Sequence, residues 1–231
     1  MTAEAGRRLA LTLVVLLSAC SVSVDDYNFV PSEETGGDGD GDGDGDGDLS
    51  PRERMIAQAG ARVRGRWATE CLEGASDDEP GFQYVYTMEA DTIRLDMIAY
   101  LADCSVPLWV QRLEALYEVS DLGPDDSYIL KLRITERRIM LLEEVAAEEA
   151  NRSPGLFGMT DWEAGVWVDL LGIVVSDGTA LKRDEVAWIA FVFLGRDEGI
   201  GASLPTVGAV PTDVLAEPFV RTDDELTIDD L

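Results

Sequence analysis

Residues 81–97 read Gly-Phe-Gln-Tyr-Val-Tyr-Thr-Met-Glu-Ala-Asp-Thr-Ile-Arg-Leu-Asp-Met, and this stretch decides the fold. Its large apolar side chains recur at every second position: Phe82, Tyr84, Tyr86 and Met88, then Ile93, Leu95 and Met97. Polar residues such as Gln83, Arg94 and Asp96 stand between them. Because successive side chains of a strand point to opposite faces, this period of two is typical of strands with one buried face. The stretch therefore predicts two strands.

The same alternation continues further along the chain. Leu130, Leu132 and Ile134 alternate with basic residues, and the run Trp188–Leu194 is almost entirely apolar. Such a run favours a central strand that is covered on both faces. Turn-forming residues separate the strands at 74–81, 123–126, 176–178 and 195–201. Many short strands with this spacing are typical of an antiparallel barrel or sandwich.

Three segments carry helical signals. Ser50-Pro51-Arg52-Glu53 has the pattern of a capping box with proline at the first helical position, and it predicts a short helix from Pro51. Residues 143–150 also favour a helix. Residues 106–119 place six apolar side chains at helical spacing, so periodicity alone predicts a helix there as well: Val106, Trp109, Val110, Leu113, Leu116 and Tyr117.

The composition restricts the classes of function. The formal net charge is −28, from 18 basic and 46 acidic residues, and the chain has no histidine. A strongly acidic surface repels nucleic acid and anionic headgroups, so we expect no nucleic-acid partner. The lack of histidine removes the usual general base, the Ser-His and Cys-His pairs and histidine metal ligands. We expect no enzyme, name no catalytic residue, and expect no cofactor or metal site.

The N-terminus has the features of an export signal. Arg7 and Arg8 precede the apolar run Leu9–Leu17, which is too short to span a bilayer as a helix, and Cys20 closes the sequence Leu-Ser-Ala-Cys. These four residues resemble the lipobox of bacterial lipoproteins. The resemblance implies cleavage of a signal peptide at residues 1–19 and a lipid anchor on Cys20; Ser21 points to the outer membrane. An ordinary signal peptide and a buried N-terminal helix are the alternatives.

If Cys20 carries a lipid, Cys71 and Cys104 are the two remaining thiols of the chain. Export would bring them into an oxidising compartment, where we expect them to form a disulfide. Two free buried thiols are the alternative. We interpret residues 20–50 as the lipidated N-terminus followed by a tether. The Gly-Asp repeat at 36–48 has no large apolar residue to bury, so we expect the tether to be disordered. Asp42, Asp44, Asp46 and Glu53 also match the spacing of a calcium-binding EF-hand loop, although the capping box explains Glu53 more simply.

We expect a folded domain at residues 51–222 and an acidic tail at residues 223–231. A second resemblance concerns the folded domain. Gly65-Arg66-Trp67 resembles the G-x-W signature of lipocalins, in which the Trp packs at the closed end of an eight-stranded barrel against an Arg beyond the last strand. Arg221 matches that Arg, so the resemblance makes Gly65, Trp67 and Arg221 the barrel-closing residues. The chain also looks like a group of uncharacterised lipocalin-like bacterial lipoproteins, through Tyr100–Cys104, Leu116–Val119, Asn151, Phe157–Trp162 and Gly165-Val166.

These resemblances imply a mainly β fold: an antiparallel lipocalin-like barrel with one or two short helices, preceded by a disordered acidic linker. They also imply that residues 106–119 form a strand. The function expected is binding of a small apolar ligand, lined by inward aromatics such as Tyr84, Tyr86, Trp109 and Trp188. Those aromatics would serve equally well as a solid core. The alternative function is a protein-interaction module in the periplasm or at the cell surface, without a ligand.

Overall fold

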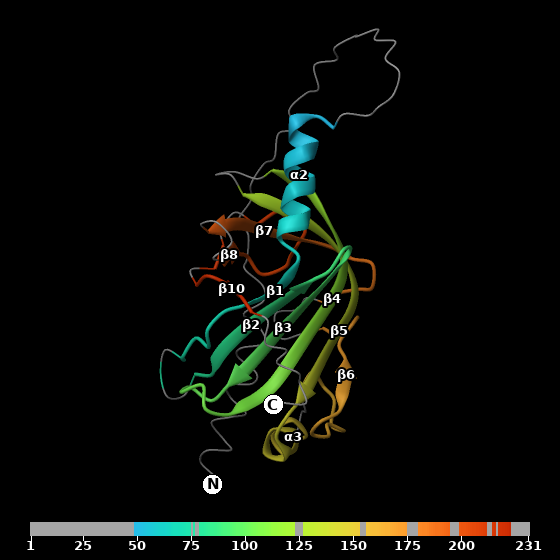
Figure 1. The fold of residues 1–231 in the computed structure, drawn as a ribbon. Helices are drawn as coiled ribbons and strands as arrows, with labels where there is room; N and C mark the ends of the chain where they lie inside the picture. The colour runs from blue at the N-terminus through green and yellow to red at the C-terminus, as the bar shows by residue number, and fades with distance from the viewer. Residues whose placement is uncertain are drawn as a thin grey trace.

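The structure is a computed structural model that describes residues 49–74, 76, 79–122, 127–152, 156–174, 180–194, 199–211, 214–215 and 217–222. Ten strands and two short helices make up this part of the chain (Figure 1). In chain order they are α2 (Pro51–Arg62), β1 (Gly65–Ala68), β2 (Gly81–Met88), β3 (Thr92–Tyr100), β4 (Pro107–Leu122), β5 (Tyr128–Leu141), α3 (Glu144–Ala150), β6 (Trp167–Asp169), β7 (Val186–Leu194), β8 (Gly199–Ala202), β9 (Thr206–Val207) and β10 (Val220–Arg221).

The strands form one antiparallel sheet in the order β10-β1-β2-β3-β4-β5-β7-β8, with β6 beside β5 and β9 beside β7. The sheet curls until its ends meet. β10 pairs with β1, and Phe219, directly before β10, forms a bridge with Ile200 of β8. Figure 1 shows β2 to β5 as the long, curved wall of this nearly closed barrel, with α2 at one end and α3 at the other. The predicted fold class, a mainly antiparallel barrel with one or two short helices, is confirmed.

The helices predicted from Pro51 and at residues 143–150 are present as α2 and α3, and α2 begins as its sequence predicts. The Ser50 hydroxyl accepts a hydrogen bond from the amide of Glu53 at 3.2 Å, and the Glu53 carboxylate accepts one from the amide of Ser50 at 2.7 Å. Hydrogen bonding of the Glu53 carboxylate to the Ser50 side chain, and then to the Ser50 backbone amide, lowers the pKa of Glu53. At the other end of α2, Ala59 and Val63 are buried in the barrel core, so the helix covers this end of the barrel.

The helix predicted by periodicity at residues 106–119 is wrong, because residues 107–119 lie within β4, a strand as the lipocalin resemblance implied. Both faces of β4 are covered. Trp109 and Leu113 point into the barrel, while Val110 packs with Val85 and Ile98 on its outer face. When both faces of a strand are apolar, apolar and polar residues no longer alternate along its sequence. The positions of the apolar residues can then also match the spacing expected of a helix.

The strand predicted at 188–194 is confirmed as part of β7, and it is central because β5 pairs on one side and β8 and β9 on the other. Ile189, Ala190 and Phe191 are buried, so both faces are covered in the middle of the strand. Toward its ends the outer face becomes more exposed, at Val186 and Leu194.

A β-bulge divides β5 into two halves. Ala115 of β4 pairs with Ile134, whereas the preceding Glu114 pairs with Glu136, so Thr135 is the extra residue. An extra residue reverses which positions face inward. Leu130, Leu132 and Ile134 face inward before the bulge, and Arg137, Ile139 and Leu141 face inward after it.

Two apolar clusters fill the barrel. The α2-side cluster surrounds Trp67, Tyr86, Phe191 and Phe219, and the α3-side cluster surrounds Trp109, Ile139, Leu141 and Trp162. They share no buried residue, although Tyr84 packs against both.

Candidate functional site

The barrel is closed where Arg221 meets Trp67. The guanidinium carbon of Arg221 lies 4.7 Å from the centroid of the Trp67 ring, and Trp67 is fully buried. Arg221 Nη2 also donates hydrogen bonds to the carbonyls of Arg62 and Arg64, at 3.0 and 2.9 Å. The contact implied by the lipocalin resemblance is therefore present, and it ties β10 to the segment between α2 and β1.

Gly65 completes this closure. Its φ of +122° lies in the region that favours glycine, and a Cβ there would stand 3.7 Å from the Arg221 guanidinium. The indole Nε1 of Trp67 donates to the carbonyl of Val63 at 2.6 Å, so the buried ring is also fixed by its polar edge. The three residues selected from sequence thus lie together where β1 pairs with β10.

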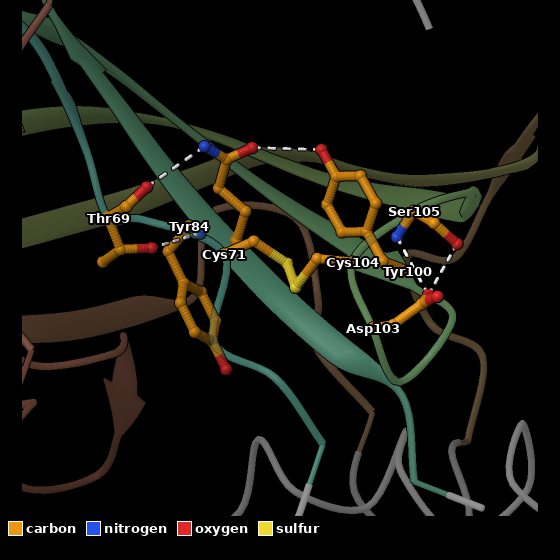
Figure 2. Close-up of a disulfide and its surroundings, with 8 residues drawn as sticks. Thr69, Cys71, Tyr84, Tyr100, Asp103, Cys104 and Ser105 are labelled. Carbon is orange, nitrogen blue, oxygen red and sulfur yellow. Dashed lines mark hydrogen bonds between the residues drawn. A yellow bond between two sulfur atoms is a disulfide. The ribbon is translucent and has the colours of Figure 1, made fainter. Parts of the chain in front are cut away.

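The predicted disulfide between Cys71 and Cys104 is confirmed. It joins the segment after β1 to the turn between β3 and β4, with Cα atoms 6.1 Å apart (Figure 2). The turn itself is held by Asp103, whose carboxylate accepts hydrogen bonds from the hydroxyl and the amide of Ser105, at 2.5 and 3.1 Å. The Ser105 hydroxyl, followed by its amide, lowers the pKa of Asp103.

Polar contacts around the disulfide hold the edge of β2. Thr69 accepts a hydrogen bond from the amide of Tyr84 through its hydroxyl, and its carbonyl accepts one from the side chain of Gln83 (Figure 2). The hydroxyl of Tyr100 donates to the Gln83 side-chain oxygen at 3.1 Å. These bonds and the disulfide attach the 69–72 segment to the sheet, which fixes the position of Tyr84 on the inner face.

The end of the barrel near α3 is covered by the segment that follows this helix. Asn151 accepts a hydrogen bond from the amide of Trp162 at 2.7 Å and donates one to the carbonyl of Trp162 at 2.8 Å. The Trp162 ring packs on Phe157 with centroids 6.4 Å apart and belongs to the α3-side cluster. Asn151 and the 157–162 motif of the sequence analysis therefore act together as a cover.

Three of the four aromatics predicted to face inward do so, and one does not. Tyr84, Tyr86 and Trp109 lie on the inner faces of β2 and β4. Trp188 pairs with Lys131 on the outer face of the sheet, with the Lys131 ammonium 6.0 Å from the ring centroid. The prediction for Trp188 is wrong, because its neighbours Ala187 and Ile189 occupy the inward positions of β7.

Tyr86 and Trp109 belong to the buried core. The Tyr86 hydroxyl donates to the carbonyl of Ser203 at 2.8 Å, and its ring packs on Phe219. Tyr84 differs, because it is only half-buried, and so is its neighbour Phe82. Phe82 stacks on Tyr84 with centroids 6.3 Å apart and meets the edge of Trp109 at 6.1 Å. Among the inward residues of β2, Phe82 and Tyr84 are the two that are only half-buried.

Sequence analysis missed two polar side chains inside the barrel, Arg137 and Gln111, which are 3% and 7% exposed. Arg137 Nη2 donates to the side-chain oxygen of Gln111 at 3.5 Å. Alternation continued from Leu130 predicts that Arg138 faces inward. The bulge at Thr135 shifts this alternation by one residue, so that Arg137 faces inward instead. A single sequence does not reveal such a bulge.

The outer face of the wall has its own polar network. Asp96 accepts hydrogen bonds from Arg112 at 2.6 and 3.1 Å and forms an ion pair with Arg94 at 3.2 Å. Arg112 and Arg138 both lie over Trp167, with guanidinium carbons 5.0 and 5.4 Å from the ring centroid. This network joins β3, β4, β5 and β6 across the outside of the sheet.

Cys20, the Gly-Asp tether and the aspartates of the EF-hand pattern lie outside the described residues. Glu53, the last position of that pattern, is engaged in the capping box of α2. Within the described part of the chain, no three acidic, cysteine or histidine side chains gather as metal ligands would. No helix among those residues has the length and apolar character needed to cross a bilayer.

No model of a known protein family matches this chain, and no curated protein is significantly similar to it.

Proposed function

We propose that this barrel binds a small apolar ligand, and that a lipid on Cys20 holds it at the outer membrane. The observation that supports ligand binding is the aromatic surface of Phe82 and Tyr84. Both side chains lie on the inner face of the nearly closed barrel, and both residues are half-buried while their inward neighbours Tyr86 and Met88 are buried. Binding sites for small molecules are concave and are lined mainly by apolar and aromatic side chains.

Native mass spectrometry on the full chain carrying Cys20→Ser tests the binding proposal. This substitution removes the site of covalent lipid attachment, so that any small molecule observed is bound noncovalently. We expect a retained small molecule that is released when the protein is denatured. Tyr84→Ala should weaken retention, because this ring lies on the inner face. Trp188→Ala is the matched control, since it removes a half-buried aromatic from the outer face.

A chain that carries no small molecule, and that gains none when exposed to an extract of cell lipids, would refute ligand binding. Equal effects of Tyr84→Ala and Trp188→Ala would place the ligand outside the barrel. In either case the protein-interaction module becomes the better function.

The anchoring proposal rests on the lipobox-like sequence that ends at Cys20. Two or three acyl chains on one cysteine give stable membrane attachment, because each buried methylene contributes about 0.8 kcal/mol. Growth with radiolabelled palmitate should label the wild-type chain and not Cys20→Ser, and only the wild type should sediment with outer membranes. A label that persists in Cys20→Ser would contradict the proposal.

A further inference from the structure

The two sides of the barrel are enclosed differently. On the α2 side, β1 extends the sheet beyond β2 at Val85–Met88, and β7 extends it beyond β5 at Tyr128–Arg133. On the α3 side, β5 is flanked by the short strand β6, and β2 is flanked by residues 69–72 through the bridge between Leu72 and Phe82. Among the residues that the structure describes, no pairing joins β6 to residues 69–72. On this side, segments other than strands must cover the inner face of the wall.

Two segments form that cover: α3, and residues 156–166, which we call the strap. α3 contributes three alanines to the α3-side cluster. Within the strap, only Leu156 and Trp162 are buried. A segment with few buried side chains has low local stability and can open while the rest of the structure stays folded.

The side chain of Asn151 attaches the centre of the strap to the end of α3. It accepts from the amide of Trp162 at 2.7 Å and donates to the carbonyl of the same residue at 2.8 Å. At the ends of the strap, the amide of Leu156 donates to the carbonyl of Ala150, and the amide of Gly165 donates to the carbonyl of Leu141, both at 2.8 Å. Loss of the Asn151 side chain would therefore release the centre of the strap and leave the bonds at its ends.

The closed strap has two unfavourable features. Phe157 has a φ of +53° and is followed by Gly158 at +76°, between the bridged residues Leu156 and Met159. Such a turn favours Asn-Gly, and a phenylalanine in the left-handed region is strained. In addition, Nε1 of the buried Trp162 has no hydrogen-bond acceptor among the described residues, which is unfavourable for a buried donor. Opening of the strap would relieve both.

We propose that the strap opens as a unit while the α2 side of the barrel stays closed, and that this opening admits a small apolar ligand. The ligand takes the surface that Leu156 and Trp162 leave, on the wall around Trp109, Ile139 and Leu141. This inference rests on the proposed ligand-binding function and adds the route of entry and the conformational step.

Hydrogen exchange resolved by residue with NMR, on the full chain carrying Cys20→Ser, tests the opening. We expect the amides of Trp162 and Gly165 to exchange at least about a hundredfold faster than that of Val110 in β4, because local opening requires less free energy than global unfolding. Asn151→Ala should accelerate exchange at Trp162 about tenfold, since it removes two hydrogen bonds, and should leave Val110 within about twofold. Gln83→Ala is the matched control, because this amide side chain bonds to a backbone carbonyl beside β2 and not to the strap.

Stopped-flow binding of N-phenyl-1-naphthylamine, an uncharged apolar fluorophore, tests the route of entry. If the ligand binds only the open form, its apparent affinity and association rate rise with the open fraction. Asn151→Ala should therefore accelerate association about as much as it accelerates exchange at Trp162, and Gln83→Ala should change neither.

The outcomes separate the two proposals. Equal exchange rates at Trp162 and Val110, or equal acceleration of both by Asn151→Ala, would refute the opening. An association rate that Asn151→Ala leaves unchanged would refute the strap as the entry and leave ligand binding intact. A strap that opens in a chain that binds no fluorophore would support the opening and contradict ligand binding. The wild-type exchange rates need no substitution, so they decide the matter even if Asn151→Ala does not fold, and Asn151→Asp, which accepts but cannot donate, should have an intermediate effect.

Discussion

Arg221 lies across the ring of Trp67, 4.7 Å from its centroid, and at the same time donates to the carbonyls of Arg62 and Arg64. One side chain near the C-terminus thus joins the last strand to the first strand and to the helix before it. The barrel is closed by this contact together with the pairing of β10 and β1 and the bridge from Phe219 to Ile200.

The first prediction concerns this contact. Arg221→Ala removes a cation–π interaction worth about 0.5–2 kcal/mol and two hydrogen bonds, each worth about 1 kcal/mol. We expect the free energy of unfolding to fall by about 2–3 kcal/mol in urea denaturation. Arg183→Ala, at an exposed position, is the control and should change it by less than about 0.5 kcal/mol. Equal effects of the two substitutions would show that the contact does not stabilise the barrel.

The second prediction concerns the disulfide, which joins residues 33 positions apart. Cross-linking a loop of this length stabilises a folded chain by about 4 kcal/mol in the chain-entropy model. The free energy of unfolding of the double variant Cys71→Ala/Cys104→Ala should be about 4 kcal/mol lower than that of the wild type, as measured by urea denaturation without reductant. The wild type in reductant should approach the same value, and a loss below about 1 kcal/mol would contradict the prediction.

A third prediction follows from the close approach of Gly81 to that disulfide. A Cβ at Gly81 would lie 2.9 Å from the Cys104 sulfur and 2.9 Å from the Leu72 carbonyl oxygen. Gly81→Ala should therefore destabilise the fold by about 1–3 kcal/mol, and by less when both cysteines are alanine. Gly60→Ala is the control, because its nearest neighbour is 3.5 Å away and alanine favours a helix. A destabilising Gly60→Ala or a neutral Gly81→Ala would contradict this reasoning.

The fourth prediction concerns Asp96, a carboxylate that is 6% exposed and bonded to Arg112 and Arg94. Removing one partner of a largely buried pair leaves the other charge uncompensated. Asp96→Ala should reduce the free energy of unfolding by about 2–4 kcal/mol. Glu136→Ala breaks a partly exposed pair with Arg138 and should cost less than about 1 kcal/mol. Thermal melts of both variants compare the two pairs directly, and the prediction fails if Glu136→Ala is the more damaging.

The fifth prediction concerns alkaline pH. Burial raises the pKa of the Tyr117 phenol above its ordinary value of 10.0, with Arg64 opposing the shift, and burial also raises the pKa of Tyr100. The Tyr117 hydroxyl donates to the carbonyl of Glu89 at 2.7 Å, which a phenolate cannot do. The folded state therefore keeps protons that the unfolded state releases. The contribution of these two tyrosines to stability is thus fully present below about pH 10 and is lost as the pH rises above it.

Urea denaturation at pH 8 to 11.5 measures this dependence. Tyr117→Phe should lose some stability at pH 8 with the hydrogen bond, and its stability should decline less steeply above pH 10. The double variant Tyr100→Phe/Tyr117→Phe should have the shallowest decline. If the free energy of unfolding of the double variant falls with pH as steeply as that of the wild type, the loss of stability at alkaline pH comes from groups other than Tyr100 and Tyr117.

Local features of the sequence determined much of the fold. The alternation at 82–88 and 93–97 appears as β2 and β3, and the capping box at Ser50 begins α2 where predicted. Each depends on neighbouring residues alone: side chains alternate along any strand, and a cap needs only the adjacent backbone amides. The disulfide was predictable as well, because the proposed lipid on Cys20 leaves only Cys71 and Cys104 to pair, and these two are bonded in the structure.

The tertiary structure decided the features that depend on long-range pairing. Residues 106–119 have helical spacing, yet their strand is held between β3 and β5 and buried on both faces. The bulge at Thr135 sends Arg137 into the barrel and Arg138 outside, and Trp188 lies outside because the register of β7 places its neighbours within. Which face a side chain occupies depends on strand register, and register is fixed by contacts between segments far apart in the chain. The sequence pattern alone therefore determined an antiparallel β fold and left a barrel and a sandwich open. Only the tertiary structure decided that the sheet curls into a nearly closed barrel with the Arg137 side chain inside it.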